Sequence, residues 1–471
     1  MTHVFETGHD EPGTADLIVK GGTVITMDAS RTIYNDGSVV VSGDRIIAIG
    51  KAADIETRFQ AKTVIDATDG LILPGLIDAH NHPGQYLSKG IGDDVSILQW
   101  LYERVYPYEA HCGEDDVFIG ALANFVEMAS SGTTCFCDPG GYHEEAVARA
   151  ANDIGIRGII SRSTRDLHNS NYPLPEQLRE TTAEAIERGA RLVERYKDGG
   201  RLRAWFSLRV PYNVSDDLCK GIRDLAERYD VGIHSHVCAQ DGENEMSVAR
   251  WGVRVLERLR RLDMLRSNLY LVHMGWVTDD EIALLAQHDV KVAHCPSASM
   301  HGAYGNISRC TFPKMHAAGI NISLGTDSAT AGRTLDMFRV LYLAACAHKD
   351  ATLDPHAFGA HAALEMATIS GARAILWDDA IGSLEPGKKA DMIVVDTSAP
   401  CWHPLGDPVR TLVYSGGGNS VRTVIVDGCV IMRDRTFPGI DLAALMSEVE
   451  RRSKAIMDRA GIRIPSFWPR I

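Results

Sequence analysis

The segment LPGLIDAHNHPGQ, residues 73–85, joins a short apolar run to two histidines at alternate positions. The apolar run ends at Ile77, and His80 and His82 follow within five residues. Residues at i and i+2 of an extended segment point to the same side. We therefore expect both imidazoles to project together from the end of a buried strand, where they could bind one ion.

Seven further β-rich runs follow this one, and amphipathic segments separate them. The runs are GTTCFCDPG, GIRGIISRS, RLRAWFSLRVP, VGIHSHV, NLYLVHMG, KVAHCPS and NISLGTDS. Three of the amphipathic segments begin with Asp-Asp, which suits the N-terminus of a helix. Together these runs make eight βα repeats, the number that closes a TIM-type barrel.

The two ends of the chain have a different texture. Residues 16–66 and 382–434 contain short β-rich runs broken by Gly-Gly, Asp-Gly and Gly-Asp turns, a pattern typical of a small all-β unit. The sequence therefore predicts an α/β protein, a (β/α)8 TIM-type barrel with a second small β-sandwich domain built from both termini. We expect residues 1–73 in the first part of the β domain and 74–380 in the barrel. Residues 381–471 complete the β domain and end in a helix.

Composition narrows the classes of partner. The net charge of −14 argues against nucleic acid and anionic membranes, and no apolar run approaches the roughly 18 residues of a membrane span. No secretory signal is recognised at the N-terminus, so the ten cysteines are interpreted as reduced thiols of a cytoplasmic protein. Cys135 and Cys137 are interpreted as buried strand residues rather than a metal site. The expected partner is a small-molecule substrate.

Histidines and one aspartate occupy the ends of four predicted strands. The first strand ends with His80 and His82, the fifth carries His236, the sixth carries His273 and the eighth ends with Asp327. Catalytic groups of such barrels gather at the C-terminal ends of the strands. A lone residue such as His273 is also typical of a satisfied core histidine, but the whole set favours a metal site. Imidazoles with a carboxylate suit Zn²⁺, with Fe²⁺ or Co²⁺ as substitutes.

These residues and the segments PGLIDAHNH and GSLEPGKKADMIVVD resemble the amidohydrolase superfamily. The segments ILQWLYERVYPYE and PYNVSDDL are similar to its triazine-hydrolase and chlorohydrolase branch, which is cytosine-deaminase-like. Within this branch the sequence also resembles the hydrolases of phenylureas and thiocarbamates. The resemblance covers residues 16–434 and implies the same barrel with a composite β domain. It also implies a homo-oligomer.

The resemblance implies roles for the strand-end residues. His80, His82, His236 and Asp327 would be metal ligands, and His273 would orient water or polarise the substrate. Binuclear relatives carry a carbamylated lysine on strand four, which RLRAWFSLRVP lacks, so we expect one divalent ion per chain. The ion would generate hydroxide from water, Asp327 would move its proton, and His273 would stabilise developing charge.

The fifth strand departs from the pattern of that branch. Aminohydrolases there carry H-x-x-E, whose Glu protonates a ring nitrogen, but HVCAQDGENE places Ala239 at that position. The neighbouring Gln240 does not titrate. Asp241, Glu243 and Glu245 could substitute only if the loop bends unusually. The loss of this acid favours substrates with an acyclic carbonyl.

Five further residues are predicted to contact the substrate. Arg209 stands where relatives have a histidine, and it could bind a substrate carbonyl or carboxylate or pair with a structural acid. Gln85 and Trp100 follow strand one, and Trp100 could instead pack within its loop. His301 and Tyr304 lie on the loop after strand seven, where His301 could equally be a solvated loop residue. An aromatic wall with few charges suits a neutral ligand.

We therefore predict a cytoplasmic, metal-dependent amidohydrolase that cleaves a non-peptide C–N bond of a small neutral molecule through a metal-bound hydroxide. N-substituted ureas, carbamates, thiocarbamates and amides are the first substrate class. The alternative is an aminohydrolase or chlorohydrolase of an aminated heterocycle such as a triazine, purine or pterin. A non-catalytic scaffold homologue is a third hypothesis, but such a protein has no need of the metal ligands, all of which are present.

Overall fold

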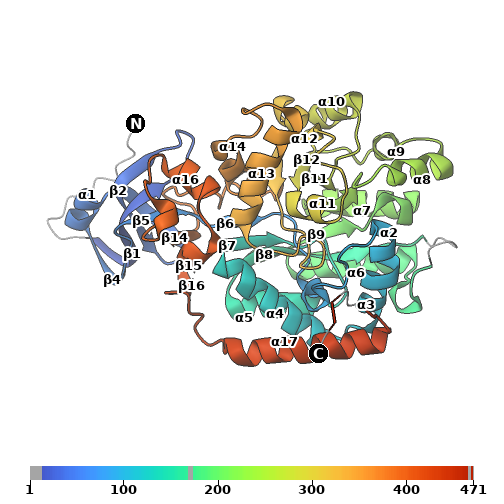
Figure 1. Ribbon diagram of the computed structural model, residues 1–471, viewed down its shortest axis with the longest axis horizontal. Coiled ribbons are helices and arrows are strands. Elements are labelled where there is room, and N and C mark those ends of the chain that lie inside the picture. The colour runs from blue at the N-terminus through green and yellow to red at the C-terminus, as the bar shows by residue number, and fades with distance from the viewer. Residues whose placement is uncertain (1–12, 168–172, 465–467, 470–471) are drawn as a thin grey trace.

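The structure is a computed structural model that describes residues 13–167, 173–464 and 468–469. The first twelve residues, part of the segment in which no secretory signal is recognised, lie outside these ranges. The described residues form two sheets of eight strands each (Figure 1). One sheet is the wall of a barrel and the other is a smaller unit beside it.

The barrel consists of eight parallel strands that follow one another in chain order. Its first and last strands meet where the Ala79 N–H donates to the Leu324 carbonyl over 2.9 Å. Each of the eight predicted runs supplies one strand, which confirms the predicted TIM-type barrel. The strands are β6 (Leu76–Asp78), β7 (Thr133–Cys137), β8 (Arg157–Thr164), β9 (Leu202–Leu208), β10 (Ile233–Val237), β11 (Leu269–His273), β12 (Lys291–His294) and β13 (Ile322–Leu324).

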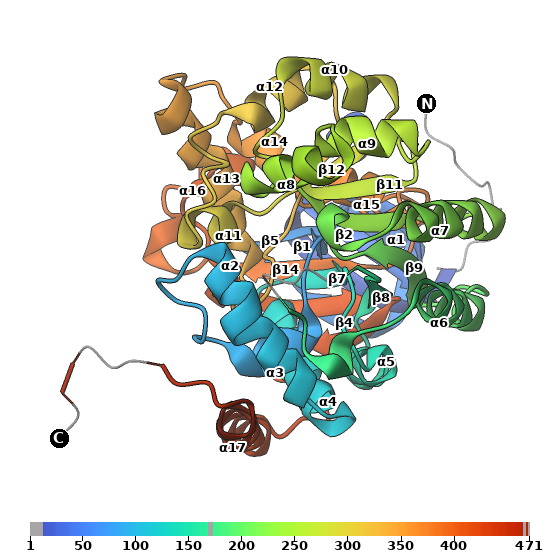
Figure 2. The same cartoon turned by 90° about the vertical axis from the view of Figure 1, so that its right-hand side faces the viewer.

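Helices cover the outside of the barrel, as Figure 2 shows. The three segments that begin with Asp-Asp are helical, and Ser215 and Thr278 cap two of them by accepting backbone N–H groups. These helices are α4 (Glu114–Ser130), α7 (Asp216–Tyr229) and α10 (Asp279–Gln287). The others are α2 (Ile97–Gln99), α3 (Tyr106–His111), α5 (Glu144–Ile154), α6 (Thr182–Arg195), α8 (Gly242–Trp251), α9 (Val255–Arg261), α11 (Pro296–His301), α12 (Thr311–Ala317), α13 (Met337–Thr352), α14 (Ala360–Met366) and α15 (Ile369–Ala374).

The smaller sheet is built from both ends of the chain, as predicted. Its order is β16-β15-β14-β5-β1-β2-β3, with β4 paired to β1, and it has an apolar core of its own that includes Val19, Val39 and Val394. The strands are β1 (Gly13–Ile25), β2 (Ile33–Ser42), β3 (Arg45–Lys51), β4 (Phe59–Asp66), β5 (Gly70–Pro74), β14 (Met392–Asp396), β15 (Val421–Val426) and β16 (Cys429–Met432); the short helices α1 (Ala52–Arg58) and α16 (Pro408–Tyr414) accompany them in the chain.

Buried and partly buried ion pairs join these parts. Arg157 of β8 donates to both carboxylate oxygens of Asp391, over 2.6 and 3.0 Å, and also to Asp427. The C-terminal helix α17 (Leu442–Ala460) runs along α3 and α4 (Figure 1). Its Arg452 and Arg459 bind the Asp116 carboxylate over 2.8 and 2.9 Å. These ion pairs fix the smaller sheet and α17 to the outside of the barrel.

None of the helices in the described ranges is long and apolar enough to cross a membrane. All ten cysteines are free of disulfide bonds. Cys135 and Cys137 are fully buried on β7, in agreement with their interpretation as strand residues.

Candidate active site

The four predicted metal ligands meet at the C-terminal mouth of the barrel. His80 and His82 follow β6, His236 lies on β10 and Asp327 follows β13. The His82 Nε2 atom is 3.2 Å from the His236 Nε2 and 3.5 Å from the Asp327 Oδ1, and the His80 Nε2 is 3.7 Å from the same oxygen. All four side chains are at least nine-tenths buried. The structure therefore brings together residues from strands that are far apart in the sequence.

The donor set fits a divalent cation. The His80 Nε2 is buried and has no hydrogen-bond partner, and it faces the other candidate ligand atoms. Two overlapping triads, His80 with His82 and His236, and His80 with His273 and Asp327, each have ligand atoms within 4.8 Å of one another. Desolvation holds the pKa of His82 and of His236 well below the usual value, so both imidazoles are neutral. Neutral imidazoles with one carboxylate are typical zinc ligands.

His273 and Asp327 both have a left-handed backbone conformation. Their φ angles are +81° and +61°, in the left-handed region that non-glycine residues rarely adopt. The His273 Nε2 lies 3.9 Å from the Asp327 Oδ2, and the Tyr304 ring packs edge-on against His273 at 5.6 Å. Burial lowers the pKa of His273 to about 4, so its imidazole is neutral.

Arg209 is buried beside the ligands and its guanidinium is only loosely paired. Its Nη2 is 3.8 Å from the Glu109 Oε1, and its Nη1 has no hydrogen-bond partner. Gln85 donates to the same Glu109 oxygen over 2.8 Å. The backbone of Arg209 also contacts one candidate metal ligand. Its carbonyl accepts the Nδ1–H of His236 over 2.8 Å. Both interpretations of Arg209, substrate contact and partner of a structural acid, are compatible with this geometry.

The loop after β10 does bend, and the bend places Glu243 against the backbone. Cys238 has a φ of +55°, and the Glu243 carboxylate accepts the N–H groups of Cys238, Ala239 and Gln240 over 3.0, 2.7 and 3.3 Å. Burial raises the pKa of Glu243 to about 7. This carboxylate therefore holds the loop in place, while Glu245 is exposed. Position 239 itself presents only a buried methyl group.

A cavity beside His82 contains a carboxyl group that sequence reasoning missed. His82, Gln85, Glu109, Asp138 and Tyr142 are among the residues that line it. Asp138 follows β7, and its Oδ1 accepts the Gly140 N–H over 2.8 Å. Burial raises the pKa of Asp138 to about 8. The rule that drew attention to the other strand ends would have found this residue in GTTCFCDPG; no comparable signal marks Glu109, which lies on a helix.

The remaining predicted substrate contacts line a second cavity, formed by Trp100, His301 and Tyr304 with Thr330 and neighbours. Trp100 packs tightly on its own loop, because a Cβ at Gly92 would lie 2.1 Å from the indole. This contact favours the packing role for Trp100. His301 is partly exposed and pairs with Asp93 over 3.3 Å.

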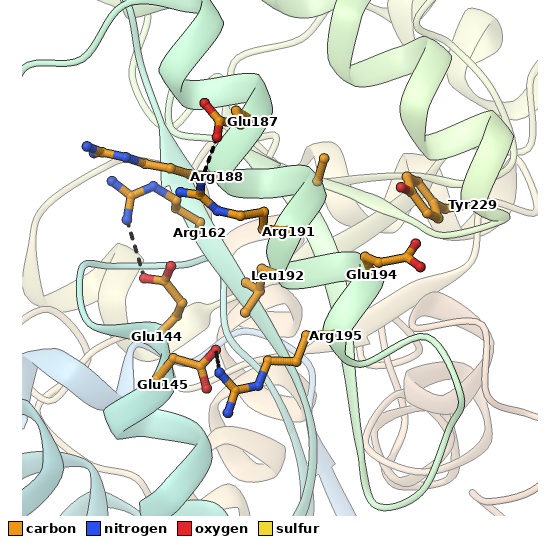
Figure 3. Close-up of a pocket in the computed structure, with 11 residues that line it drawn as sticks. Glu144, Glu145, Arg162, Glu187, Arg188, Arg191, Leu192, Glu194, Arg195 and Tyr229 are labelled. Atoms are coloured by element: carbon orange, nitrogen blue, oxygen red, sulfur yellow. Dashed lines mark hydrogen bonds and ion pairs between the residues drawn. The ribbon is translucent and has the colours of Figure 1, made fainter.

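Two other features lie apart from the ligand cluster. His294 is buried and bonded to His348, Nε2 to Nε2, over 3.0 Å. Figure 3 shows a separate cavity lined by charged residues from α5, α6 and β8 and by Tyr229 of α7. Its guanidinium groups are paired with acids, as in Arg195–Glu145 at 2.8 Å, and no histidine lines it. The ligand cluster is therefore the candidate active site.

Known proteins are similar to this chain in sequence and in fold. The chain is 34% identical over 444 residues to a 5-methylthioadenosine/S-adenosylhomocysteine deaminase of Caldanaerobacter subterraneus subsp. tengcongensis, with 94% of this chain and 99% of the relative covered. A zinc-bound adenosine deaminase from Xanthomonas campestris has a TM-score of 0.88 at 30% identity, covering 95% of this chain and 100% of that one. A zinc-complexed atrazine chlorohydrolase from Arthrobacter aurescens TC1 shares the fold, with a TM-score of 0.84, 24% identity and coverages of 93% and 100%.

The predicted resemblance to the amidohydrolase superfamily is thus confirmed, and triazine-hydrolase structures share the fold of this chain. Residues 71–431 match the model of the amidohydrolase family, so the chain belongs to this family and is a hydrolase of carbon–nitrogen bonds other than peptide bonds.

Proposed function

We propose that the protein is a hydrolytic deaminase that releases ammonia from an aminated heterocycle of the purine-nucleoside type. The observation that carries this proposal is the cluster of three imidazoles and a carboxylate beside His273, in a chain related over almost its whole length to a deaminase of such compounds. The order of the two substrate hypotheses from the sequence is therefore reversed. The cytoplasmic location and the homo-oligomer stay predictions.

One zinc ion is the proposed cofactor, and His80, His82, His236 and Asp327 would hold it. When bound, a divalent ion supplies Lewis-acid chemistry that makes water nucleophilic at neutral pH. The hydrogen bonding of His236 supports its proposed role as a ligand. Because the Nδ1–H of His236 is donated to the Arg209 carbonyl, the Nε2 of that neutral ring is left unprotonated.

His273 and Asp327 act on the reacting atoms in this proposal. The neutral His273 can donate a hydrogen bond to the heterocycle as negative charge develops on it. Burial disfavours the charged form of Asp327, but its interactions with His80 lower its pKa below the ordinary value, so its carboxylate is ionised and can accept a proton. The same carboxylate then passes that proton to the leaving amino group.

A ring nitrogen must also be protonated, and we assign this proton to Asp138. The cavity that Asp138 shares with His82 and Gln85 reaches the ligand cluster. Since burial raises the pKa of Asp138 to about 8, the carboxyl holds its proton at pH 7. Ala239 cannot take this role and Glu243 is engaged with the backbone. Glu109 lines the same cavity but accepts from Gln85 and faces Arg165 and Arg209, so we assign the proton to Asp138.

Arg209 and Gln85 are the proposed substrate contacts. The unpaired Nη1 of Arg209 is a donor, and the Oε1 of Gln85 is a buried acceptor without a partner. Buried polar groups of this kind are costly unless a ligand satisfies them. A substrate with an acceptor and a donor on neighbouring atoms would satisfy both.

An N-substituted urea, carbamate, thiocarbamate or amide is the second candidate substrate class. One observation favours it: Ala239 removes the acid that ring deamination uses in similar enzymes, and an acyclic carbonyl has no ring nitrogen to protonate. This hypothesis assigns no proton transfer to Asp138.

Two substrate panels separate the candidates. Zinc-loaded protein would be incubated with 5′-methylthioadenosine, S-adenosylhomocysteine and adenosine, and separately with phenylureas and carbamates, while ammonia and amine release are measured. We expect ammonia from the aminopurine panel and none after zinc is removed with a chelator. Turnover confined to the ureas and carbamates would support the second candidate, and turnover of neither panel would contradict both.

A further inference from the structure

A second buried histidine on β10 lies directly behind the ligand cluster. His234 precedes His236 by two residues, so both side chains point to the interior of the barrel, and His234 is fully buried. Its Nε2 is 3.1 Å from the Nδ1 of His80. Its Nδ1 is 3.6 Å from the Sγ of Cys137 on β7. A chain of contacts therefore runs from Cys137 through His234 to a candidate metal ligand.

The protonation of this chain follows from the geometry. The His80 Nε2 faces the other ligand atoms and has no hydrogen-bond partner, and a nitrogen that binds a cation must be unprotonated. When His80 binds a cation through Nε2, its proton is on Nδ1, where it is donated to the His234 Nε2. His234 in turn carries its proton on Nδ1, which donates to the Cys137 sulfur.

The contacts of His234 are with an imidazole, a thiol and an aromatic ring. None of the carboxylates in the described ranges forms an ion pair with it, and the Tyr270 ring packs on it at 4.9 Å. Among the described residues, no carboxylate therefore competes with His80 for the His234 Nε2.

We propose that His234 is a positioning residue, which keeps the proton of His80 on Nδ1 and so leaves the His80 Nε2 free to bind the metal ion. The C-x-C motif of the sequence thereby gains a role, since the Cys137 sulfur accepts the last proton of the chain. The inference rests on the metal site of the proposed function, but not on the substrate. Partners that orient metal-bound histidines in this way are worth about 10- to 100-fold in metal affinity.

The test compares two substitutions of His234. His234→Leu removes the acceptor, whereas His234→Gln can keep an amide oxygen near the position of the Nε2. Zinc affinity would be measured by competition with a chelator, without substrate. We expect His234→Leu to lose about 10- to 100-fold in affinity, and His234→Gln to stay within about threefold of the wild type.

The chain offers a matched control in the second buried histidine pair. His348 bonds to His294 over 3.0 Å and lies on α13, outside the barrel. His348→Leu should lower thermal stability and leave zinc affinity unchanged. Should His234→Leu fail to fold, the Co²⁺-loaded His234→Gln and wild-type proteins carry the test, because the d–d absorption reports ligand geometry. Matching spectra support the proposal, and a Gln variant with lost or altered Co²⁺ binding contradicts it.

The outcome is separable from that of the proposed function. A folded His234→Leu variant with wild-type zinc affinity would overturn the positioning role and leave the deaminase proposal intact. Conversely, weakened zinc binding in this variant, in a protein that deaminates none of the aminopurines, would support the positioning role and remove the deaminase proposal.

Discussion

Replacing Arg209 with methionine separates the two roles that the sequence left open for this residue. The substitution removes the guanidinium and keeps an unbranched apolar side chain in a buried position. The Glu109 carboxylate is not left alone, since Gln85 still donates to it over 2.8 Å and the Arg165 Nη2 lies 3.6 Å away. The lost contact between Arg209 and Glu109, at 3.8 Å, is longer than a hydrogen bond. We therefore expect the fold of Arg209→Met to survive.

The loss in turnover should be much larger than the loss in stability. A hydrogen bond from a charged donor contributes about 1.5–3 kcal/mol, and this corresponds to about a 10- to 150-fold lower kcat/KM. The loss applies if the unpaired Nη1 of Arg209 donates to the substrate. The assay is the initial rate of ammonia release across substrate concentrations, with urea unfolding measured on the same preparations.

Arg165→Met is the matched control, because this arginine is also fully buried and also faces Glu109. Its guanidinium stacks on Tyr106 and Tyr142, 4.7 and 5.6 Å from the ring centres, rather than beside the ligands. We expect it to lower stability and to leave kcat/KM within about threefold. Were Arg209→Met to behave like this control, with normal kcat/KM and reduced stability, Arg209 would be a structural partner of Glu109 and the substrate contact would be wrong.

Three further predictions test other parts of the site and the fold. Asp327→Asn should lower kcat by at least about 100-fold with an unchanged circular dichroism spectrum, since Asn tolerates the left-handed backbone; an unchanged rate would assign the proton transfer elsewhere. Because the pKa of Asp138 is raised to about 8, kcat should fall as the pH rises through about 8, and Asp138→Asn should be slow throughout and lack this decline. The raised pKa also means that the carboxyl stabilises the fold below about pH 4 and that this contribution is lost as the pH rises through about 8, which urea midpoints at pH 5 and 9 would show for the wild type against Asp138→Asn. Arg157→Met leaves two carboxylates without their buried partner and should cost about 3–5 kcal/mol in urea unfolding, whereas the exposed pair of Arg191 should contribute less than about 1 kcal/mol.

The barrel and the ligand set were predictable because one rule connects them. Parallel strands of a closed barrel end at the same mouth, so polar residues that directly follow apolar runs must converge there. His80, His236 and Asp327 follow from this rule with no knowledge of the tertiary structure. The same rule applies to Asp138, which ends the second run, and an i+2 argument applies to His234; both were recognisable from the sequence.

Other parts of the site depend on tertiary packing. Glu109 lies on a helix within the long connection after β6, and no periodicity indicates that it meets Arg209, which follows β9. The position of Glu243 depends on a left-handed turn at Cys238. A cysteine in the sequence does not predict such a turn. Local sequence signals describe the strands well, but they do not describe how the connecting loops fold back over the mouth.

The loop after β13 shows how backbone preference and chemistry are divided between neighbouring residues. A Cβ at Gly325 would lie 2.7 Å from the Cβ of His80, so only glycine at this position lets the segment after β13 pack against the segment after β6. Asp327 follows two residues later with a left-handed φ of +61°, where glycine would adopt the conformation without strain. Its N–H donates to the His80 carbonyl over 2.9 Å, which anchors the turn. Since glycine could neither bind a cation nor carry a proton, an aspartate occupies this position, because its short polar side chain tolerates the left-handed backbone and its N–H is held by the His80 carbonyl.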